Sequence, residues 1–496
     1  MAYKLTKIGQ FPELVVSTRE NATRITTAHT AGRLKRITRR IYTTNLNDAP
    51  ENIIRRNLWS LVAALVPGAL ITDRTALDGK PAKDGSIFVI ADRTRPIILP
   101  GLSIHVRTGA APLPSDKPFI EGLYMASIPR ALLENIRRAR SGKNTVSRTF
   151  TRIEMEEYLE TILRRSGQEG LNHLRDETRQ IATQLNLNDE FSKLDKLMGA
   201  LLHTHTAPMR SAIGKARVQS EPYDPNRVKL FEALFASLRG FVPTPRPAGL
   251  SDLSSTLHFY ESYFSNYIEG TKFEVPEALE IVFDGKQSNR PADAHDVLGT
   301  YNIVSDGFGY ARVPNNADRL LILLRERHGI MMAWRSEMTP GIFKDVANYF
   351  GGTEFVKPEL VTGTLTKGYE IYQALAEPFH RAVFMMFLVA EVHPFRDGNG
   401  RMARIMMNAE LVAAQQQRVI IPTILRSNYL SALRAMTHNS NPEPLIRVLD
   451  YAQRWVASIN WQNLDGAYQQ LLSSNAFMES NEAEEKGIRL ELVKSP

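Results

Sequence analysis

The segment His393 to Arg404, HPFRDGNGRMAR, gathers side chains that can move a proton, bind a divalent cation and hold phosphate. His393 titrates near neutral pH and can take a proton from an attacking hydroxyl. Asp397 offers a hard oxygen ligand of the kind that a phosphate-bound Mg²⁺ needs. Arg401 and Arg404 are three positions apart, so on a helix both guanidinium groups lie on one side and reach the same polyphosphate. One short segment therefore holds a base, a metal ligand and a phosphate clamp.

The flanking residues predict how this segment is positioned. The stretch RAVFMMFLVAEV (381–392) is apolar nearly all round and predicts a buried helix, while Pro394 disfavours helix at His393. After the glycines, MARIMMNAELVAA resumes a helical period. A glycine-containing loop that opens a helix presents unpaired N–H groups to an anion. The alternative is an ordinary glycine-rich turn with solvated arginines and a hydrogen-bonded polar histidine.

The segment matches H-x-F-x-D/E-G-N-G-R-x-x-R at all eight specified positions and thus resembles the signature of Fic domains. This resemblance implies an all-α domain that transfers AMP from ATP, with Mg²⁺, to a Ser, Thr or Tyr hydroxyl of a protein. By the same resemblance His393 is the general base, Phe395 anchors the loop and Asp397 binds Mg²⁺. The implied phosphate-binding residues are Gly398, Asn399, Gly400, Arg401 and Arg404. Relatives that transfer phosphate itself usually carry a bulkier residue at the position of Gly400, so nucleotide transfer is favoured. A donor other than ATP stays open.

Two further stretches resemble parts of Fic proteins, and the resemblance covers about 250–460. NYFGGTEFVKPELV (348–361) resembles the flap hairpin that holds a target segment by strand addition, with an ordinary surface hairpin as the alternative. RSNYLSALRAM, with Tyr429, resembles the helix that closes the domain, where packing is the usual role.

The stretch SNYIEG (265–270) resembles the inhibitory motif S/T-x-x-x-E-G/N, here Ser265, Glu269 and Gly270. The resemblance implies that Glu269 pairs with Arg404 and withdraws it from the phosphates, which is autoinhibition from the N-terminal side. In several relatives this glutamate also positions water for removing AMP, and modification of the chain by itself is a related expectation. The alternative is an amphipathic helix with its aromatic residues in the core.

The first part of the chain is strongly basic, with seven cations against one acid between residues 17 and 42. The Ser17 and Glu20 spacing predicts a capped helix over 18–30, and LKRITRRIY predicts a strand. A helix near 52–66 and strands at GALIT, SIFVIAD, RPIILPG and LSIHVRTG then predict a small α/β unit. This region resembles the antitoxin of abortive-infection type IV systems, in which a winged helix represses its own promoter. The implied DNA contacts are Arg33, Lys35, Arg36, Arg39 and Arg40. A solvated basic edge strand and a structural or target-recruiting role are the alternatives.

Composition sets the remaining limits. The 496 residues carry a net charge of +8 and no cysteine, which excludes disulfides and a cysteine nucleophile. We expect a cytoplasmic protein without a secretory signal or a membrane span, because the longest apolar stretch (58–71) is short and contains Pro67. The expected partners are ATP, a protein target, the chain itself, DNA and a second copy in a homodimer. The expected fold is multidomain α+β. Its predicted parts are a basic winged-helix-like segment (1–48), a small α/β domain (49–127), a helical region (128–240), a linker (241–250), an inhibitory helix region (251–285), the Fic catalytic domain (286–460) and a tail (461–496).

Overall fold

In the computed structural model, which describes residues 11–93, 95–139, 145–244 and 255–493, the chain divides into two units, Met1–Val218 and Gln219–Pro496. The division falls inside the helical region predicted for 128–240. Residues 245–250 of the predicted linker and 251–254 of the predicted inhibitory region lie outside the described residues. The multidomain α+β class is confirmed, with the larger sheet in the first unit and mostly helices in the second.

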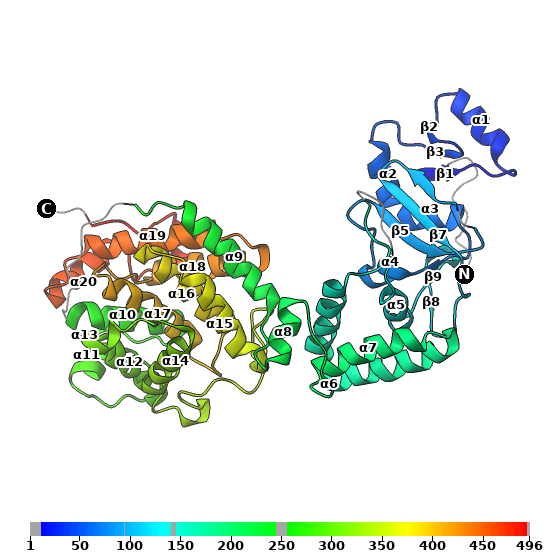
Figure 1. Cartoon of the computed structure of the whole chain (residues 1–496). Coiled ribbons are helices and arrows are strands. Elements are labelled where there is room, and N and C mark those ends of the chain that lie inside the picture. Colours follow the sequence, from blue (N-terminus) through cyan, green and yellow to red (C-terminus); the bar gives the residue numbers. More distant parts are fainter. Residues whose placement is uncertain (1–10, 94, 140–144, 245–254, 494–496) are drawn as a thin grey trace. The chain divides into compact units, whose positions relative to one another are not determined.

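The first unit begins with a three-stranded antiparallel sheet and one helix (Figure 1). The sheet has the order β1-β3-β2, and the four elements are β1 (Leu14–Val16), α1 (Ala22–Thr30), β2 (Lys35–Thr38) and β3 (Ile41–Thr43). The predicted capping box at Ser17 is wrong, because α1 follows Asn21 and has no side-chain cap. The single predicted strand is also wrong. The chain reverses between β2 and β3, where Arg40 has a φ of 70°, so the stretch forms a hairpin.

A six-stranded mixed sheet follows, with the order β6-β7-β5-β4-β9-β8. Its strands are β4 (Leu70–Ile71), β5 (Ser86–Ile90), β6 (Ile97–Leu99), β7 (Leu102–Arg107), β8 (Lys117–Pro118) and β9 (Tyr124–Met125). The pairs β5/β7 and β4/β9 are parallel and the other pairs are antiparallel. The four predicted strands are present as β4 to β7. The predicted helix divides at Asn57 into α2 (Pro50–Arg56) and α3 (Leu58–Leu65).

Helices complete the first unit. They are α4 (Asp73–Asp78), α5 (Ile128–Asn135), α6 (Arg152–Leu185), α7 (Asn188–Leu201) and α8 (Ala212–Val218), with a short 3₁₀ turn η1 (Ile120–Gly122). A capping box between Thr151 and Glu154 starts α6, since each side chain bonds the backbone N–H of the other. Leucines and methionines of α6 and α7 form the core between these helices.

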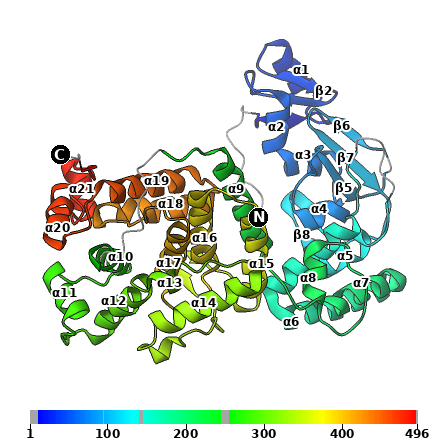
Figure 2. The same cartoon turned by 60° about the vertical axis from the view of Figure 1, so that its left-hand side comes forward.

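The second unit consists of helices around one buried pair (Figure 1 and Figure 2). Its helices are α9 (Pro225–Gly240), α10 (Ser255–Ile268), α11 (Val275–Phe283), α12 (Pro291–Val304), α13 (Gly307–Tyr310), α14 (Ala317–Met331), α15 (Val361–Tyr372), α16 (Pro378–Val392), α17 (Asn399–Ala413), α18 (Arg426–Asn439), α19 (Glu443–Ser458), α20 (Leu464–Ser473) and α21 (Ser480–Lys486). Shorter elements are η2 (Ser336–Met338), η3 (Pro358–Leu360), η4 (Thr423–Leu425) and the hairpin β10 (Tyr349–Phe350) with β11 (Thr353–Glu354).

The buried pair is α16 and α17, which lie side by side in the middle of the unit (Figure 2). From Ala382 to Val389 every residue of α16 is fully buried, as its apolar sequence predicts. The loop that joins these two helices is therefore held at both ends by the best-packed part of the unit.

Residues 480–490 of the predicted tail pack against the rest of the unit. Ala483 and Leu490 are buried in a cluster with aromatic residues of α10, and Tyr451 donates a hydrogen bond to the Leu490 carbonyl. Among the described residues, no helix is long and apolar enough to cross a membrane.

Candidate active site

The motif residues lie on the loop between α16 and α17 and on the first turns of α17. His393 ends α16 in the left-handed region with a φ of 54°, and Gly398, with a φ of 73°, precedes the first residue of α17. The side chain of Asn399 accepts a hydrogen bond from Phe395 N and donates one to Phe395 O, both 2.8 Å long. The loop is thus closed on itself over a fully buried Phe395. The geometry gives the Asn399 side chain a role in holding the loop, while its backbone lies at the N-terminus of α17.

His393 is held as a neutral imidazole. Its Nδ1 lies 3.1 Å from the Ala390 carbonyl, and its ring stacks on Phe355 with centroids 3.7 Å apart. A carbonyl only accepts, so the proton sits on Nδ1 and Nε2 keeps its lone pair. Burial, together with the nearby charge of Lys344, lowers the pKa of His393 to about 4. The ring is therefore a free base at neutral pH with its acceptor nitrogen directed away from the backbone.

Two residues that sequence reasoning missed support the loop from outside the motif. His328 on α14 accepts a hydrogen bond from Gly341 N at its Nδ1, so its Nε2 donates to the Asp397 carbonyl at 3.1 Å. The His328 ring also stacks on Phe395 with centroids 3.7 Å apart. Lys344 donates its backbone N–H to the Pro394 carbonyl. Neither residue belongs to a recognisable spacing, and no sequence signal pointed to them.

Lys344 itself is nearly fully buried beside the loop. Its Nζ donates to Asn348 Oδ1 at 2.6 Å, and Asn348 in turn donates to the Phe395 carbonyl at 2.9 Å. Burial lowers the pKa of Lys344 to about 7, with the charge of Arg227 as a second cause. This lysine thus loses much of its charge near neutral pH while it ties the segment before the flap to the loop.

The hairpin predicted at 348–361 is present as β10 and β11. Tyr349 pairs with Glu354 and Phe350 with Thr353, and both glycines of the turn have positive φ values. The side chains of Tyr349 and Phe350 are exposed. The next residue after the hairpin is Phe355, which stacks on His393, so the hairpin is anchored beside the base.

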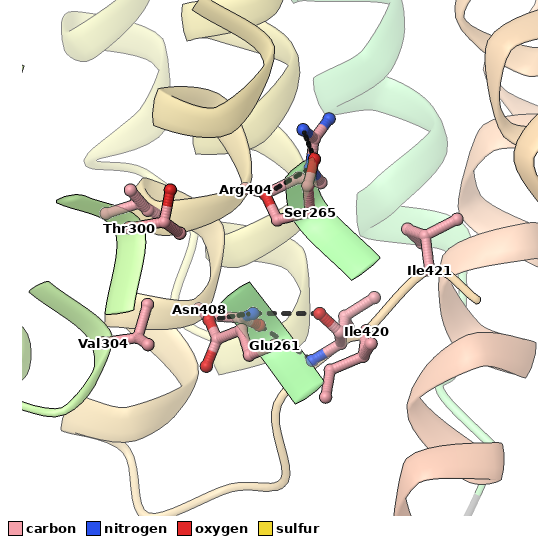
Figure 3. Close-up of a pocket in the computed structure, with 10 residues that line it drawn as sticks. Glu261, Ser265, Thr300, Val304, Arg404, Asn408, Ile420 and Ile421 are labelled. Carbon is pink, nitrogen blue, oxygen red and sulfur yellow. Dashed lines mark hydrogen bonds between the residues drawn. The ribbon is translucent and has the colours of Figure 1, made fainter. Parts of the chain in front are cut away.

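Arg404 is buried, and it contacts Ser265 of the predicted inhibitory motif (Figure 3) as well as Glu269. Its Nη2 lies 2.6 Å from Glu269 Oε1 and donates to the Ser265 carbonyl at 2.8 Å, and its Nε donates to Ser265 Oγ at 3.0 Å. Glu269 follows the last residue of α10, and Gly270 then turns with a φ of 103°. A Cβ placed on Gly400 would lie 2.2 Å from Glu269 Oε1. The glutamate therefore occupies the space directly in front of the glycine loop.

Arg401 points to a different set of acids. It is 3% exposed, and its Nη1 lies 2.9 Å from Asp296 Oδ2 on α12. Its Nη2 lies 3.6 Å from Asp397 Oδ2. The two arginines are on one side of α17 as expected, yet each is paired with a separate carboxylate. Sequence reasoning missed Asp296, which lies about a hundred residues before the motif.

The carboxylate of Asp397 suits a phosphate-bound Mg²⁺. Its side chain is 44% exposed and lies at the open end of the loop beside Arg401. The described residues contain no group of three or more His, Cys, Asp or Glu side chains that could hold a metal. Magnesium commonly binds through one or two carboxylates and completes its shell with water and substrate phosphates. One exposed carboxylate is a sufficient protein contribution for such an ion.

The five basic residues predicted to contact DNA lie together in the first unit. They are Arg33, Lys35, Arg36, Arg39 and Arg40, on β2 and at its two ends. All five are exposed, and none forms an ion pair with another described residue. The hairpin thus presents an unneutralised basic edge.

The second unit thus contains a helix, a glycine-containing loop and a second helix that together carry a base, a carboxylate and two arginines. Residues 321–411, from α14 into α17, match the model of the Fic/DOC family, so the chain contains a Fic domain. It is similar to the protein adenylyltransferase Fic of Drosophila willistoni, with 30% identity over 95 residues, which is 19% of each chain. The same protein of Drosophila persimilis is 32% identical over 89 residues, 18% of this chain and 17% of the relative. The chain thus spans about a fifth of the length of these curated relatives.

Solved structures of two Fic proteins are also similar. A Fic domain containing signaling protein from Bacteroides thetaiotaomicron has 18% identity and a TM-score of 0.35, with 46% of this chain and 93% of that chain covered. Fic-1 from C. elegans has 18% identity and a TM-score of 0.37, with 64% and 87% covered.

Proposed function

We propose that this chain is a protein adenylyltransferase that transfers AMP from ATP to a Ser, Thr or Tyr hydroxyl of a protein. The observation that carries the proposal is a neutral His393 at the start of the loop, with Asp397 in the loop and Arg401 and Arg404 on the first turns of α17. The names of the curated relatives support the choice of reaction.

The proposed step begins with the target hydroxyl donating its proton to Nε2 of His393. The hydroxyl oxygen then bonds to the α-phosphorus, the bond from that phosphorus to the bridging oxygen breaks, and pyrophosphate leaves. N–H groups at the start of α17 and the two arginines stabilise the charge that develops on phosphate oxygens. Asp397 would hold Mg²⁺, which supplies further neutralisation of phosphate charge when bound. Catalysis by this arrangement rests on positioning and charge stabilisation.

The donor and the chemistry are tested together. The purified chain is incubated with ATP, CTP, GTP and UTP, each labelled at the α-phosphate in one series and at the γ-phosphate in another. We expect label from α-labelled ATP only, lost in His393→Ala and kept in the control His173→Ala, whose side chain is exposed on α6. Label from the γ-phosphate would indicate phosphate transfer instead. Absence of any His393-dependent label, in the parent and also in Glu269→Gly, would contradict the proposed activity.

We further propose that Glu269 is a brake on this activity. Its carboxylate is bonded to Arg404 and lies against Gly400, which is where the phosphates of a productive ATP would lie. The expected result for Glu269→Gly is stronger self-labelling by ATP. If the glutamate also positions a water, AMP release from the labelled protein is expected to slow in the same variant. Equal labelling in both proteins would argue against the brake.

A second candidate function is duplex DNA binding by the first unit. The strand order β1-β3-β2, with α1 directly before the β2–β3 hairpin, and the exposed cations on that hairpin favour it. Cations that meet phosphates release counterions, so the binding constant should fall steeply with salt, by a log–log slope of about −0.9 for each contact. The variant Lys35→Ala/Arg36→Ala should bind more weakly with a shallower slope. Lys193→Ala/Lys196→Ala, exposed on α7, is the control. If both variants behave alike, the basic strand serves only to prevent edge pairing.

A further inference from the structure

Arg401 is held by residues that the Fic motif does not contain. Asp296, inside α12, is only 8% exposed on its side chain, and its Oδ2 contacts Arg401 Nη1 at 2.9 Å. Asn266 on α10 accepts from the same Nη1 at 3.4 Å. The Asn266 amide is itself fixed, because its Nδ2 donates to the Ser262 carbonyl and to Thr300 Oγ1. Residues of two helices, α12 and α10, therefore contact one nitrogen of this arginine.

Because Nη1 is held in this way, the Nη2 side of the guanidinium is directed toward the loop. Arg401 Nη2 lies 3.6 Å from Asp397 Oδ2 and would lie 3.7 Å from a Cβ on Gly398. Arg401 Nε has no hydrogen-bond partner among the described residues. A planar guanidinium held at one nitrogen has a fixed direction for its remaining donors. Of those donors, Nη2 is the one beside the Asp397 carboxylate and the glycine loop, where a phosphate oxygen could accept from it.

A second arginine shares the Asp296 carboxylate. Arg335, after α14, lies 3.3 Å from the same Oδ2 and bonds Glu337 Oε1 at 2.8 Å through its Nε. The neighbours of Asp296 and Arg335 also meet, because His295 and Trp334 stack with centroids 5.2 Å apart. Asp296 therefore holds Arg401 at one nitrogen and is itself held by Arg335, whose Nε is paired with Glu337.

We propose that Asp296 is a positioning residue that acts through Arg401. By holding Nη1, it directs the free donors of Arg401 toward the nucleotide phosphates. Arg335 holds the same carboxylate from the other side. This rests on the proposed nucleotidyl transfer. A competing carboxylate such as Glu269 would have to leave for ATP to bind. Asp296 instead stays in place, because it is buried within a helix and contacts an edge that the phosphates do not use.

The test is a double-mutant cycle in the Glu269→Gly background. Asp296→Asn keeps the shape of the side chain and removes its charge, and is expected to lower kcat/KM for ATP about tenfold, with Arg401→Ala costing more. On the Arg401→Ala background, Asp296→Asn should cost nothing further. Glu370→Gln, an exposed acid on α15 outside this cluster, is the control and should leave kcat/KM unchanged.

Equilibrium binding of ATP in magnesium-free buffer, measured by calorimetry on the same variants, gives a readout independent of turnover. We expect Asp296→Asn to weaken this binding, and Arg335→Ala to weaken it less and only when Arg401 is present. Independent effects of Asp296 and Arg401 that multiply would overturn the inference, as would tighter ATP binding by Asp296→Asn. If Arg401→Ala itself changes neither labelling nor binding, the proposed function is what fails.

Discussion

Exposing His393 to water should move the pH at which activity is lost. The replacement is Phe355→Ala, which removes the ring stacked 3.7 Å from the imidazole. Burial holds the pKa of His393 at about 4 instead of 6.5, a difference that corresponds to about 3 kcal/mol against the charged form. Letting water reach one face should return part of this penalty and raise the pKa by about one.

The assay is kcat/KM for AMP transfer against pH in the Glu269→Gly background. The parent should stay active as the pH falls through 6.5 and lose activity near a pKa of about 4. Phe355→Ala should lose activity at a pH about one unit higher than the parent does. Phe350→Ala, an exposed flap aromatic, is the control and should match the parent. A parent that loses activity at the ordinary histidine pKa would refute the reasoning, since burial would then not set the proton affinity.

The same pKa predicts a sign for stability. His393 in the folded chain has a pKa below its unfolded value, so between 6.5 and about 4 the unfolded chain takes up a proton that the folded chain does not. Its contribution therefore makes the folded state less stable as the pH falls through this window, and has no effect above it. Urea unfolding of the parent and of Phe355→Ala at both ends of the window measures this, and the loss should be smaller in the variant.

Two other replacements probe the contacts of the loop. Glu269→Gln keeps the shape of the brake and removes the charge of a partly solvated ion pair, worth about 1 kcal/mol, so ATP-dependent labelling should rise about fivefold, while Glu274→Gln, an exposed acid nearby, should change nothing. Asn399→Ala deletes both bonds to the Phe395 backbone and should lower the free energy of unfolding by about 2–4 kcal/mol in urea; a loss below 1 kcal/mol would mean that water replaces the amide.

The parts of the site that could be predicted are those that are local in sequence. A buried helix, a proline and two glycines specify the turn from α16 to α17 within a few residues, so the motif loop followed from its own sequence. The hairpin at 348–361 also carries its signal locally, as a glycine pair between short β-prone runs. The contact between Glu269 and Arg404 was expected only through the family resemblance, because 135 residues separate them.

The parts that could not be predicted depend on packing between distant helices. His328 and Asp296 reach the loop because α14 and α12 pack near α17, and no spacing in the chain encodes that. The errors near the N-terminus have local causes. The Asn21 side chain accepts a hydrogen bond from the Thr18 N–H, and this contact replaces the expected capping box. The turn between β2 and β3 has Arg40 at positive φ, whereas a glycine or asparagine there would have predicted the turn.

The two motif arginines differ in how firmly their carboxylate partners are held. This difference assigns regulation of activity to one arginine and positioning of the phosphates to the other. Glu269 lies just beyond the end of α10, and its side chain is 36% exposed. A partly solvated carboxylate can leave its partner at small cost, because water replaces the lost bond. Asp296 lies within α12 at 8% exposure, and removing it would strand two arginines, one of them deeply buried. We therefore expect activity to be regulated at Arg404, whose carboxylate partner can move. We expect Arg401, whose carboxylate partner cannot move, to fix the orientation of the phosphates.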